Sequence, residues 1–289
     1  MKKKQLVCPI CAEVNSRPKW EMYSYRDKRY SMHICQGCES EFSAPMKAAS
    51  SEYYSYDTPA LRWEFGKVAE LLPQDAKVLD VGCSDGSFMK LLADAGIQST
   101  GIDFNEKKVR QARGRGLDCH TANIQEAPIG DRKYNAVSAF HVIEHLERPV
   151  DFFEDIKSVL SQLGKIYISV PNTDRFSLKF RRDEPDYPPN HLTRISKKGM
   201  GKLVERTGFH IINTYIEPSE INWRRASSEA SNRIVDLLKL RKLLTISQLI
   251  NIPTKLVLYV ISQPFVAFRF LAAGQKEGYT GLYVLERKR

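Results

Sequence analysis

Val78-Leu79-Asp80-Val81-Gly82-Cys83-Ser84-Asp85-Gly86-Ser87-Phe88 divides into a short strand, a glycine turn and the start of a helix. The aliphatic residues before the turn favour a strand, the two glycines allow a tight turn that a ligand can approach closely, and apolar residues at helical spacing follow. In an open α/β sheet such a turn lies at the carboxyl ends of the strands, where nucleotide-like ligands bind. We therefore expect the ligand site of this chain at the turn.

Strand and helix patterns alternate on both sides of this turn. Helices are expected at 61–72, 105–115, 150–163 and 196–208, and strands at 78–81, 99–103, 117–122, 134–140, 165–170, 209–215 and 279–287. Strands that alternate with helices imply a parallel sheet with right-handed crossovers, so the expected fold class is α/β.

The charges near the turn indicate the kind of ligand. Asp80 lies two positions before the first glycine and Asp85 lies inside the turn, so a cationic group suits the site better than a pyrophosphate. Asp103 ends the next strand, where an acid can accept hydrogen bonds from both ribose hydroxyls. The chain lacks the G-x-G-x-x-G spacing of dinucleotide-binding turns. The pattern favours a ligand with adenosine at one end and a positive sulfonium and ammonium at the other.

Four motifs together resemble the class I S-adenosylmethionine-dependent methyltransferases, in particular the group that acts on small molecules. They are the glycine stretch, Gly101-Ile102-Asp103-Phe104-Asn105-Glu106, Phe140-His141-Val142-Ile143-Glu144-His145-Leu146 and Ile168-Ser169-Val170-Pro171-Asn172. The resemblance covers about residues 60–215 and the last strand. It implies a Rossmann-like, doubly wound seven-stranded sheet with an antiparallel last strand, and an enzyme whose cofactor is S-adenosyl-L-methionine.

The resemblance also implies a set of cofactor-binding residues. These are Asp80, Gly82, Cys83 and Gly86 around the methionine part, Asp103 at the ribose, Phe104, Asn123 and Ile124 at the adenine, and Phe140 lining the pocket. The chain departs from the family pattern at two positions. Ser84 stands where a middle glycine is usual, and Asn123 stands where an aspartate is common.

The segment from His141 to His145 carries the candidate catalytic chemistry. Its spacing matches the H-x-x-E-H pattern of a zinc peptidase, but that site lies on a helix, whereas this segment directly follows a buried strand. In the quinone-precursor O-methyltransferases these positions hold a divalent metal, so His141, Glu144 and His145 are an alternative metal set. We favour a local role for Glu144 and His145, tied to neighbouring backbone. His141 and His191 are the candidate general bases, because histidine titrates near neutral pH; each is otherwise a structural histidine.

Two close cysteine pairs predict a metal site near the N-terminus. They are Cys8 with Cys11 and Cys35 with Cys38, separated by 23 residues. A two-residue gap lets both thiolates of a pair bind one ion, and two pairs complete a tetrahedron. We expect structural zinc in a small hairpin module, with four free thiols as the alternative.

The region after the fifth expected strand is where the acceptor should be recognised. The loop 171–194 is long and basic, which suits a phosphate or a carboxylate or else a solvated surface. Residues 217–277 separate the last two strands and combine basic with apolar segments. We expect a helical cap or a dimer interface there; the alternative is peripheral membrane contact through 224–273.

Composition sets the remaining expectations. The chain has 289 residues and a net charge of +10, which suggests an anionic partner or only a basic surface. Paired cysteines indicate a reducing compartment. The N-terminal lysines are not followed by an apolar core, so we do not expect them to begin a signal peptide. The sequence shows no uninterrupted apolar run of spanning length. We expect a cytoplasmic protein, with peripheral membrane association as the alternative.

Three parts follow from these patterns: a zinc-ribbon-like module at 1–48, a methyltransferase domain at 49–216 and 278–289, and a cap at 217–277. The expected function is O- or C-methylation of a sugar, a glycolipid or a quinone-like acceptor, with a small-molecule or lipid-linked substrate as the partner. One alternative is methylation of rRNA or tRNA through the zinc ribbon and basic surface. RNA is the less favoured partner, because strand 134–140 ends without the Asn/Asp-Pro-Pro-aromatic signature. The other alternative is a non-catalytic cofactor-binding module. The oligomeric state is not indicated.

Overall fold

A computed structural model describes residues 6–25, 28–48, 62–128, 133–175, 186–218 and 278–288. The chain divides into two units. The first contains residues 1–173, 183–215 and 280–289, and the second contains residues 174–182 and 216–279. The elements below form the first unit, apart from the end of one strand.

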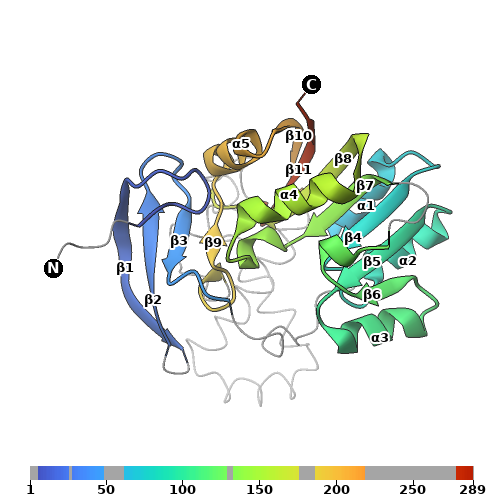
Figure 1. Ribbon diagram of the computed structural model, residues 1–289, viewed down its shortest axis with the longest axis horizontal. Helices are drawn as coiled ribbons and strands as arrows, with labels where there is room; N and C mark the ends of the chain where they lie inside the picture. Colours follow the sequence, from blue (N-terminus) through green and yellow to red (C-terminus); the bar gives the residue numbers. More distant parts are fainter. Residues whose placement is uncertain are drawn as a thin grey trace, which may run out of the picture. The chain divides into compact units, whose positions relative to one another are not determined.

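A seven-stranded sheet is the centre of the first unit (Figure 1). Its strands, in spatial order, are β10 (Phe209–Ile216), β11 (Thr280–Arg287), β8 (Leu160–Pro171), β7 (Tyr134–Phe140), β4 (Lys77–Val81), β5 (Gln98–Asp103) and β6 (Cys119–Thr121). The pairs from β8 to β6 are parallel, and β11 pairs antiparallel with β8. The predicted sheet and its antiparallel last strand are confirmed.

Helices cover both faces of the sheet because neighbouring strand residues point to opposite sides. Val78 packs in one apolar cluster with side chains of α1 (Trp63–Leu71) and α2 (Ser87–Asp94). Leu79, the next residue, packs in another cluster with side chains of α4 (Pro149–Val159) and α5 (Lys197–Arg206). A third cluster holds the inner side of α3 (Glu106–Gly114). Two short 3₁₀ turns, η2 (Ile124–Glu126) and η3 (Ile143–His145), follow β6 and β7.

One predicted helix is too long. The helix expected at 150–163 ends at Val159, and Leu160 already belongs to β8. Leu160 is buried and pairs with Tyr134 of β7, whereas Leu163 is largely exposed. Strand pairing therefore outweighs the helical pattern over these four residues.

The N-terminal module is a second, four-stranded sheet. Its strands are β1 (Ser16–Tyr25), β2 (Lys28–Cys35), β3 (Glu41–Ala44) and β9 (Thr193–Arg194) in that order. The antiparallel pair of β1 and β2 confirms the expected hairpin. The fourth strand comes from the loop after β8, about 150 positions further along the chain. No local sequence pattern predicts the pairing of β3 with β9.

The predicted cap at 217–277 and the membrane contact at 224–273 lie outside the described residues, except for Glu217 and Pro218. Within the described ranges, the structure contains no helix that is both long and apolar enough to cross a membrane.

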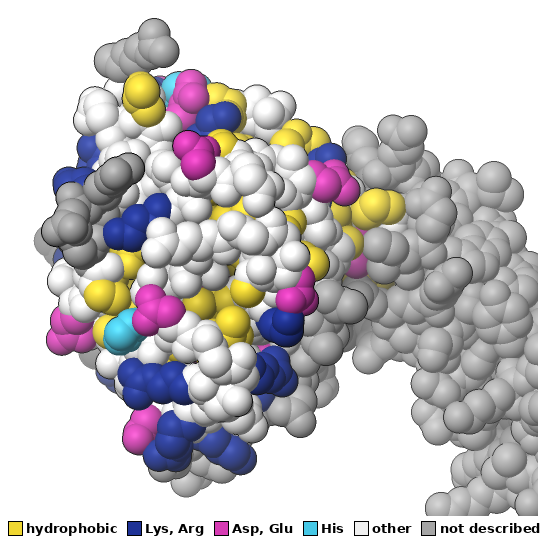
Figure 2. All heavy atoms as spheres, turned by 90° about the vertical axis from the view of Figure 1, so that its right-hand side faces the viewer, with side chains coloured by type: hydrophobic (Ala, Val, Ile, Leu, Met, Phe, Trp, Pro, Cys, Tyr) yellow, Lys and Arg dark blue, Asp and Glu magenta, His cyan; other side chains and the backbone are white. Residues whose placement is uncertain are grey.

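Basic side chains gather on the face that includes α3 (Figure 2). Acidic side chains lie among them. Arg110 is 2.9 Å from Glu106, and Arg115 is 3.1 Å from Asp85. Part of the positive charge on this face is therefore neutralised by local ion pairs, which are weak where they are exposed.

Candidate active site

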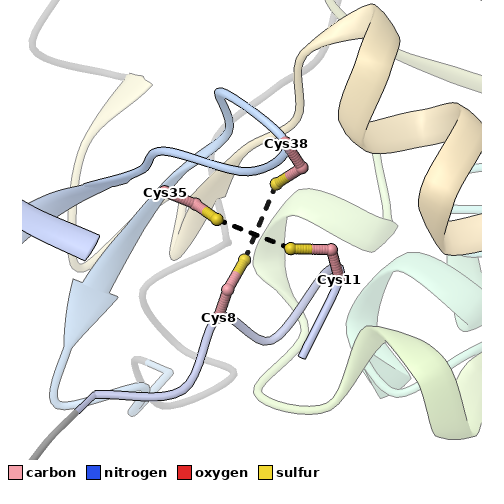
Figure 3. Close-up of side chains that lie close together, drawn as sticks. All are labelled: Cys8, Cys11, Cys35 and Cys38. Atoms are coloured by element: carbon pink, nitrogen blue, oxygen red, sulfur yellow. Dashed lines mark hydrogen bonds between the residues drawn. The ribbon is translucent and has the colours of Figure 1, made fainter. Parts of the chain in front are cut away.

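The four cysteines of the predicted metal site converge on one point (Figure 3). The Sγ atoms of Cys8 and Cys38 are 3.7 Å apart, and those of Cys11 and Cys35 are 3.4 Å apart. A zinc–sulfur bond of about 2.3 Å places two sulfurs of a tetrahedron about 3.8 Å apart. Three of the four residues are fully buried. The donor set and its spacing therefore fit a tetrahedral zinc ion.

The glycine turn after β4 has the tight geometry that its sequence predicts. Gly82 and Gly86 have φ angles of +74° and +79°, which disfavour other residues. The N–H groups of Gly82 and Cys83 both donate to the carbonyl of Ile102, at 2.8 and 3.1 Å. A Cβ atom at Gly82 would lie 2.7 Å from Cγ2 of Val142. The turn thus lies directly against the segment after β7. Ser84, where the family usually has glycine, adopts a φ of +50°.

The two acids predicted for the cofactor lie at this turn in different environments. Asp103 accepts hydrogen bonds from the N–H groups of Ser84 at 2.9 Å and Asn105 at 2.8 Å. Burial raises the pKa of Asp103, and these N–H donors oppose that rise. Asp80 is buried and accepts a hydrogen bond of 2.7 Å from the hydroxyl of Ser138. Burial raises the pKa of Asp80 to about 7, and the charge of Asp103 adds to the rise.

The remaining residues predicted for the cofactor fall into two groups. Phe104 is 58% exposed and follows Asp103 directly, as a platform for an adenine ring requires. Asn123 is exposed at the start of η2, and Ile124 is buried in the core beside it. Phe140, predicted to line the pocket, is the last residue of β7. Its ring packs against Phe65 and Phe88 at centroid distances of 4.9 and 4.8 Å, so it belongs to the aromatic core under the turn.

His141 directly follows β7 and has a strained conformation, with a φ of +54°. Its Nδ1 atom donates to Oε1 of Glu144 at 3.1 Å, and its Nε2 atom lies 3.4 Å from Oε1 of Glu64. The hydroxyl of Thr280 is also 3.4 Å from Nε2. Burial alone lowers the pKa of His141, but Glu144 and Glu64 outweigh it, so the pKa is raised. The imidazole ring remains one-fifth exposed between two fully buried carboxylates.

The second candidate base, His191, packs against His145. Its ring packs edge-on against the ring of His145 at a centroid distance of 4.7 Å. His145 donates through Nδ1 to the carbonyl of Asn190 at 2.6 Å, so the expected tie of His145 to backbone is present. Glu144 differs from the expectation of a tie to backbone, because its side chain binds His141. The Glu144 carbonyl accepts a hydrogen bond from the N–H of Leu192.

The residues that could bind a second metal ion differ from the expected set of His141, Glu144 and His145. The ligand atoms that converge within 4.8 Å belong to Glu144, His145 and His191, and not to His141. The pKa of Glu144 is lowered to about 2, because the neighbouring histidines outweigh the effect of burial. A carboxylate between histidines is a reasonable ligand set for a divalent ion, but it also suits a network of charged hydrogen bonds.

Sequence reasoning missed the residues that surround these histidines. Glu64 lies on the buried face of α1, where an acid among apolar residues could have been noticed. Arg194, Glu41, Asp186 and Tyr187 form a buried polar cluster next to His191 and have no local signal. Their positions result from the pairing of β3 with β9.

Comparisons with known proteins agree with this geometry. Residues 53–214, more than half of the chain, match the methyltransferase domain family. A probable S-adenosylmethionine-dependent methyltransferase of Mycolicibacterium smegmatis is 32% identical over 139 residues, which cover 47% of this chain and 53% of that protein. A ubiquinone biosynthesis O-methyltransferase of Bordetella bronchiseptica is 27% identical over 152 residues, covering 50% and 58%. The chain thus spans about half the length of these curated relatives.

Among solved structures, the magnesium protoporphyrin IX methyltransferase of Synechocystis PCC 6803 is similar with a TM-score of 0.49. It is 14% identical, and the match covers 82% of this chain and 92% of that one. The family match over residues 53–214 and the seven-stranded sheet point to the same conclusion. The chain belongs to the methyltransferase domain family, and the relatives it resembles are S-adenosylmethionine-dependent methyltransferases.

Proposed function

We propose that this protein transfers a methyl group from S-adenosylmethionine to an oxygen or carbon atom of a small-molecule acceptor, with His141 as the general base. The observation that carries the proposal is the position of His141. It follows β7 directly, lies next to Val142 and the glycine turn, and keeps part of its ring exposed between Glu64 and Glu144.

The donor side suits a cationic adenosine ligand. When bound, S-adenosylmethionine supplies a methyl group on a positively charged sulfur, which an acceptor electron pair displaces in line. Asp103 would accept hydrogen bonds from the ribose, and Phe104 would cover the adenine. The buried carboxyl of Asp80 would favour the positive end of the ligand. Most of the rate then comes from alignment of donor and acceptor.

A hydroxyl or carbon acid must also lose a proton, and His141 is placed to take it. The Nδ1–H bond to Glu144 fixes the ring and leaves Nε2 as the basic atom. Glu64 and Glu144 both stabilise the imidazolium that forms when Nε2 accepts the proton. Because they also raise the pKa of His141 in the resting enzyme, transfer should become faster as the pH rises through that pKa.

For the acceptor we propose a quinone-like molecule, because several relatives are ubiquinone biosynthesis O-methyltransferases; a sugar is the alternative. We further propose that Cys8, Cys11, Cys35 and Cys38 bind one structural zinc ion, because their geometry fits the metal.

Methyl-labelled S-adenosylmethionine tests the proposal. A lysate is incubated with the labelled donor and either the wild-type protein or His141→Gln, and is then separated into RNA, lipid and small-molecule fractions. We expect label in the small-molecule or lipid fraction with the wild type, and a strong loss with His141→Gln.

The other outcomes contradict the proposal in distinct ways. Label in RNA would identify a nucleic-acid methyltransferase. An absence of label from every fraction, with retained binding of S-adenosylhomocysteine, would identify a non-catalytic module. Equal labelling by wild type and His141→Gln would remove His141 from the role of base.

A further inference from the structure

The N-terminal module with strands β1–β3, called the zinc module below, shares one sheet with the segment 186–196, which carries His191. Strand β3 pairs with β9 through Glu41 opposite Arg194 and Phe42 opposite Thr193. The N–H of Ser43 donates to the carbonyl of Leu192 at 2.8 Å and continues this pairing toward His191. The strand β9, which begins two residues after His191, is therefore an edge strand of the zinc module.

The metal-binding loop also contacts the end of this segment. The hydroxyl of Ser196 donates to the carbonyl of Cys38 at 2.5 Å, and the N–H of Ser196 donates to the hydroxyl of Ser40 at 3.1 Å. A Cβ atom at Gly199 would lie 1.9 Å from the same Ser40 hydroxyl, so α5 begins in close contact with the loop. A shift of the loop would therefore move Ser196, just after β9, and the start of α5.

A buried ion pair fixes the register between the two parts. Arg194 donates through Nη1 to both carboxylate oxygens of Glu41, at 2.9 and 3.1 Å, and to the hydroxyl of Tyr187 at 2.8 Å. Its Nε atom lies 3.7 Å from Asp186, and Asp186 lies 3.7 Å from Nδ1 of His191. Removal of Glu41 would leave the buried charge of Arg194 with the more distant Asp186 alone, so this pair is sensitive to substitution.

The same segment then reaches the proposed base. Asn190 binds His145, Leu192 binds the carbonyl of Glu144, and the carboxylate of Glu144 binds His141. On the donor side, by contrast, Asp80 and Asp103 make their hydrogen bonds with β7 and with the turns after β4 and β5.

We propose that the zinc module is a positioning part of the acceptor site: through Glu41 and Arg194 it holds the 186–196 segment, and thereby His191 and Glu144, in register with His141. Glu41 is the positioning residue. This inference rests on the proposed function for its effect on methyl transfer, but the structural coupling can be measured without any acceptor.

Glu41→Gln tests the coupling, and Glu39→Gln is the matched control. Glu39 belongs to the same module and pairs with Lys198 of α5, but this ion pair is exposed. Both variants are compared with wild type by zinc content, affinity for S-adenosylhomocysteine, amide hydrogen exchange and label transfer to the lysate fraction identified above.

We expect Glu41→Gln to keep its zinc and its affinity for S-adenosylhomocysteine. Exchange in residues 186–196 should become about 10-fold faster, because a charged hydrogen bond is lost, while residues 98–104 stay unchanged. Transfer should fall about 100-fold through misplacement of the acceptor side. The ring-proton resonances of His145 and His191 should also shift. Glu39→Gln should match the wild type in every measurement.

Unchanged exchange at 186–196 in Glu41→Gln would overturn the inference, as would an equal effect of Glu39→Gln. If wild type transfers no label at all while Glu41→Gln still loosens 186–196, the proposed function fails and the coupling stands. If Glu41→Gln does not fold, Tyr187→Phe removes one acceptor of Arg194 and should give the same changes on a smaller scale; its failure to do so would also overturn the inference.

Discussion

The proposed donor side and the proposed acceptor side of the site come from different ranges of the sequence. The donor side uses β4, β5 and the two turns that follow them, so its acids and glycines lie within residues 80–105. The acceptor side joins α1, η3, the 186–196 segment and β3 of the zinc module. The donor side therefore depends on local backbone geometry, and the acceptor side depends on long-range contacts.

Removal of the metal site should separate the two sides most strongly. In Cys35→Ser one of the four ligands is lost, and structural zinc in small modules contributes on the order of 10 kcal/mol to folding. We expect loss of bound zinc, unfolding of β1–β3 and loss of methyl transfer, while S-adenosylhomocysteine still binds. Metal analysis, hydrogen exchange and calorimetry measure these quantities.

Cys119→Ser is the control for the loss of a buried thiol. Cys119 lies on β6 and is not part of the four-cysteine cluster. The Cys119→Ser variant should keep its bound zinc. Loss of ligand binding together with the zinc in Cys35→Ser would contradict the independence of the donor side.

Substitution of the proposed base should affect only the acceptor side. In His141→Gln the side chain cannot take the acceptor proton, so transfer should fall by about 10²–10⁴-fold. The affinity for S-adenosylhomocysteine should change little. His210→Gln is the control, because His210 is a half-exposed histidine that pairs with Glu286. A comparable loss in both variants would show that the effect is structural.

The difference between the sides also explains what the sequence could predict. The seven-stranded sheet with its antiparallel last strand, the cysteine cluster and the glycine turn were predicted because each depends on a short pattern, whereas the cofactor roles of Asp80 and Asp103 stay predictions. The partnership of Glu41 with Arg194 was not, because the two residues are 153 positions apart and neither lies in a motif. For Phe140, the sequence does not distinguish a side chain that faces a ligand from one that packs in the core, because the end of a buried strand looks similar in both cases.

Loss of Asp103, the acid proposed to bind the ribose, should weaken the donor side by a smaller factor. Asp103→Asn removes the charge that accepts the N–H groups of Ser84 and Asn105, and charged hydrogen bonds contribute about 1.5–3 kcal/mol. The affinity for S-adenosylhomocysteine should fall by roughly 10- to 100-fold. Hydrogen exchange at 186–196 should be unchanged. Asp94→Asn, at an exposed ion pair with Lys90, should bind normally. A loosened 186–196 segment in Asp103→Asn would mean that the sides are coupled through the turn.

The smallest expected effect is a pH dependence confined to the donor side. The pKa of Asp80 is raised to about 7, first by burial and then by the charge of Asp103. A raised carboxyl pKa means that the protonated form dominates below that pH, and a neutral carboxyl attracts a cationic ligand less than a carboxylate does. The affinity for S-adenosylmethionine should therefore fall as the pH drops below 7, by at most about tenfold per pH unit. Asp80→Asn should remove this dependence and bind more weakly at pH 8. The amide exchange of residues 186–196 should not follow the Asp80 titration. An affinity that stays constant between pH 6 and pH 8 in the wild type would contradict the assignment of Asp80 to the positive end of the ligand.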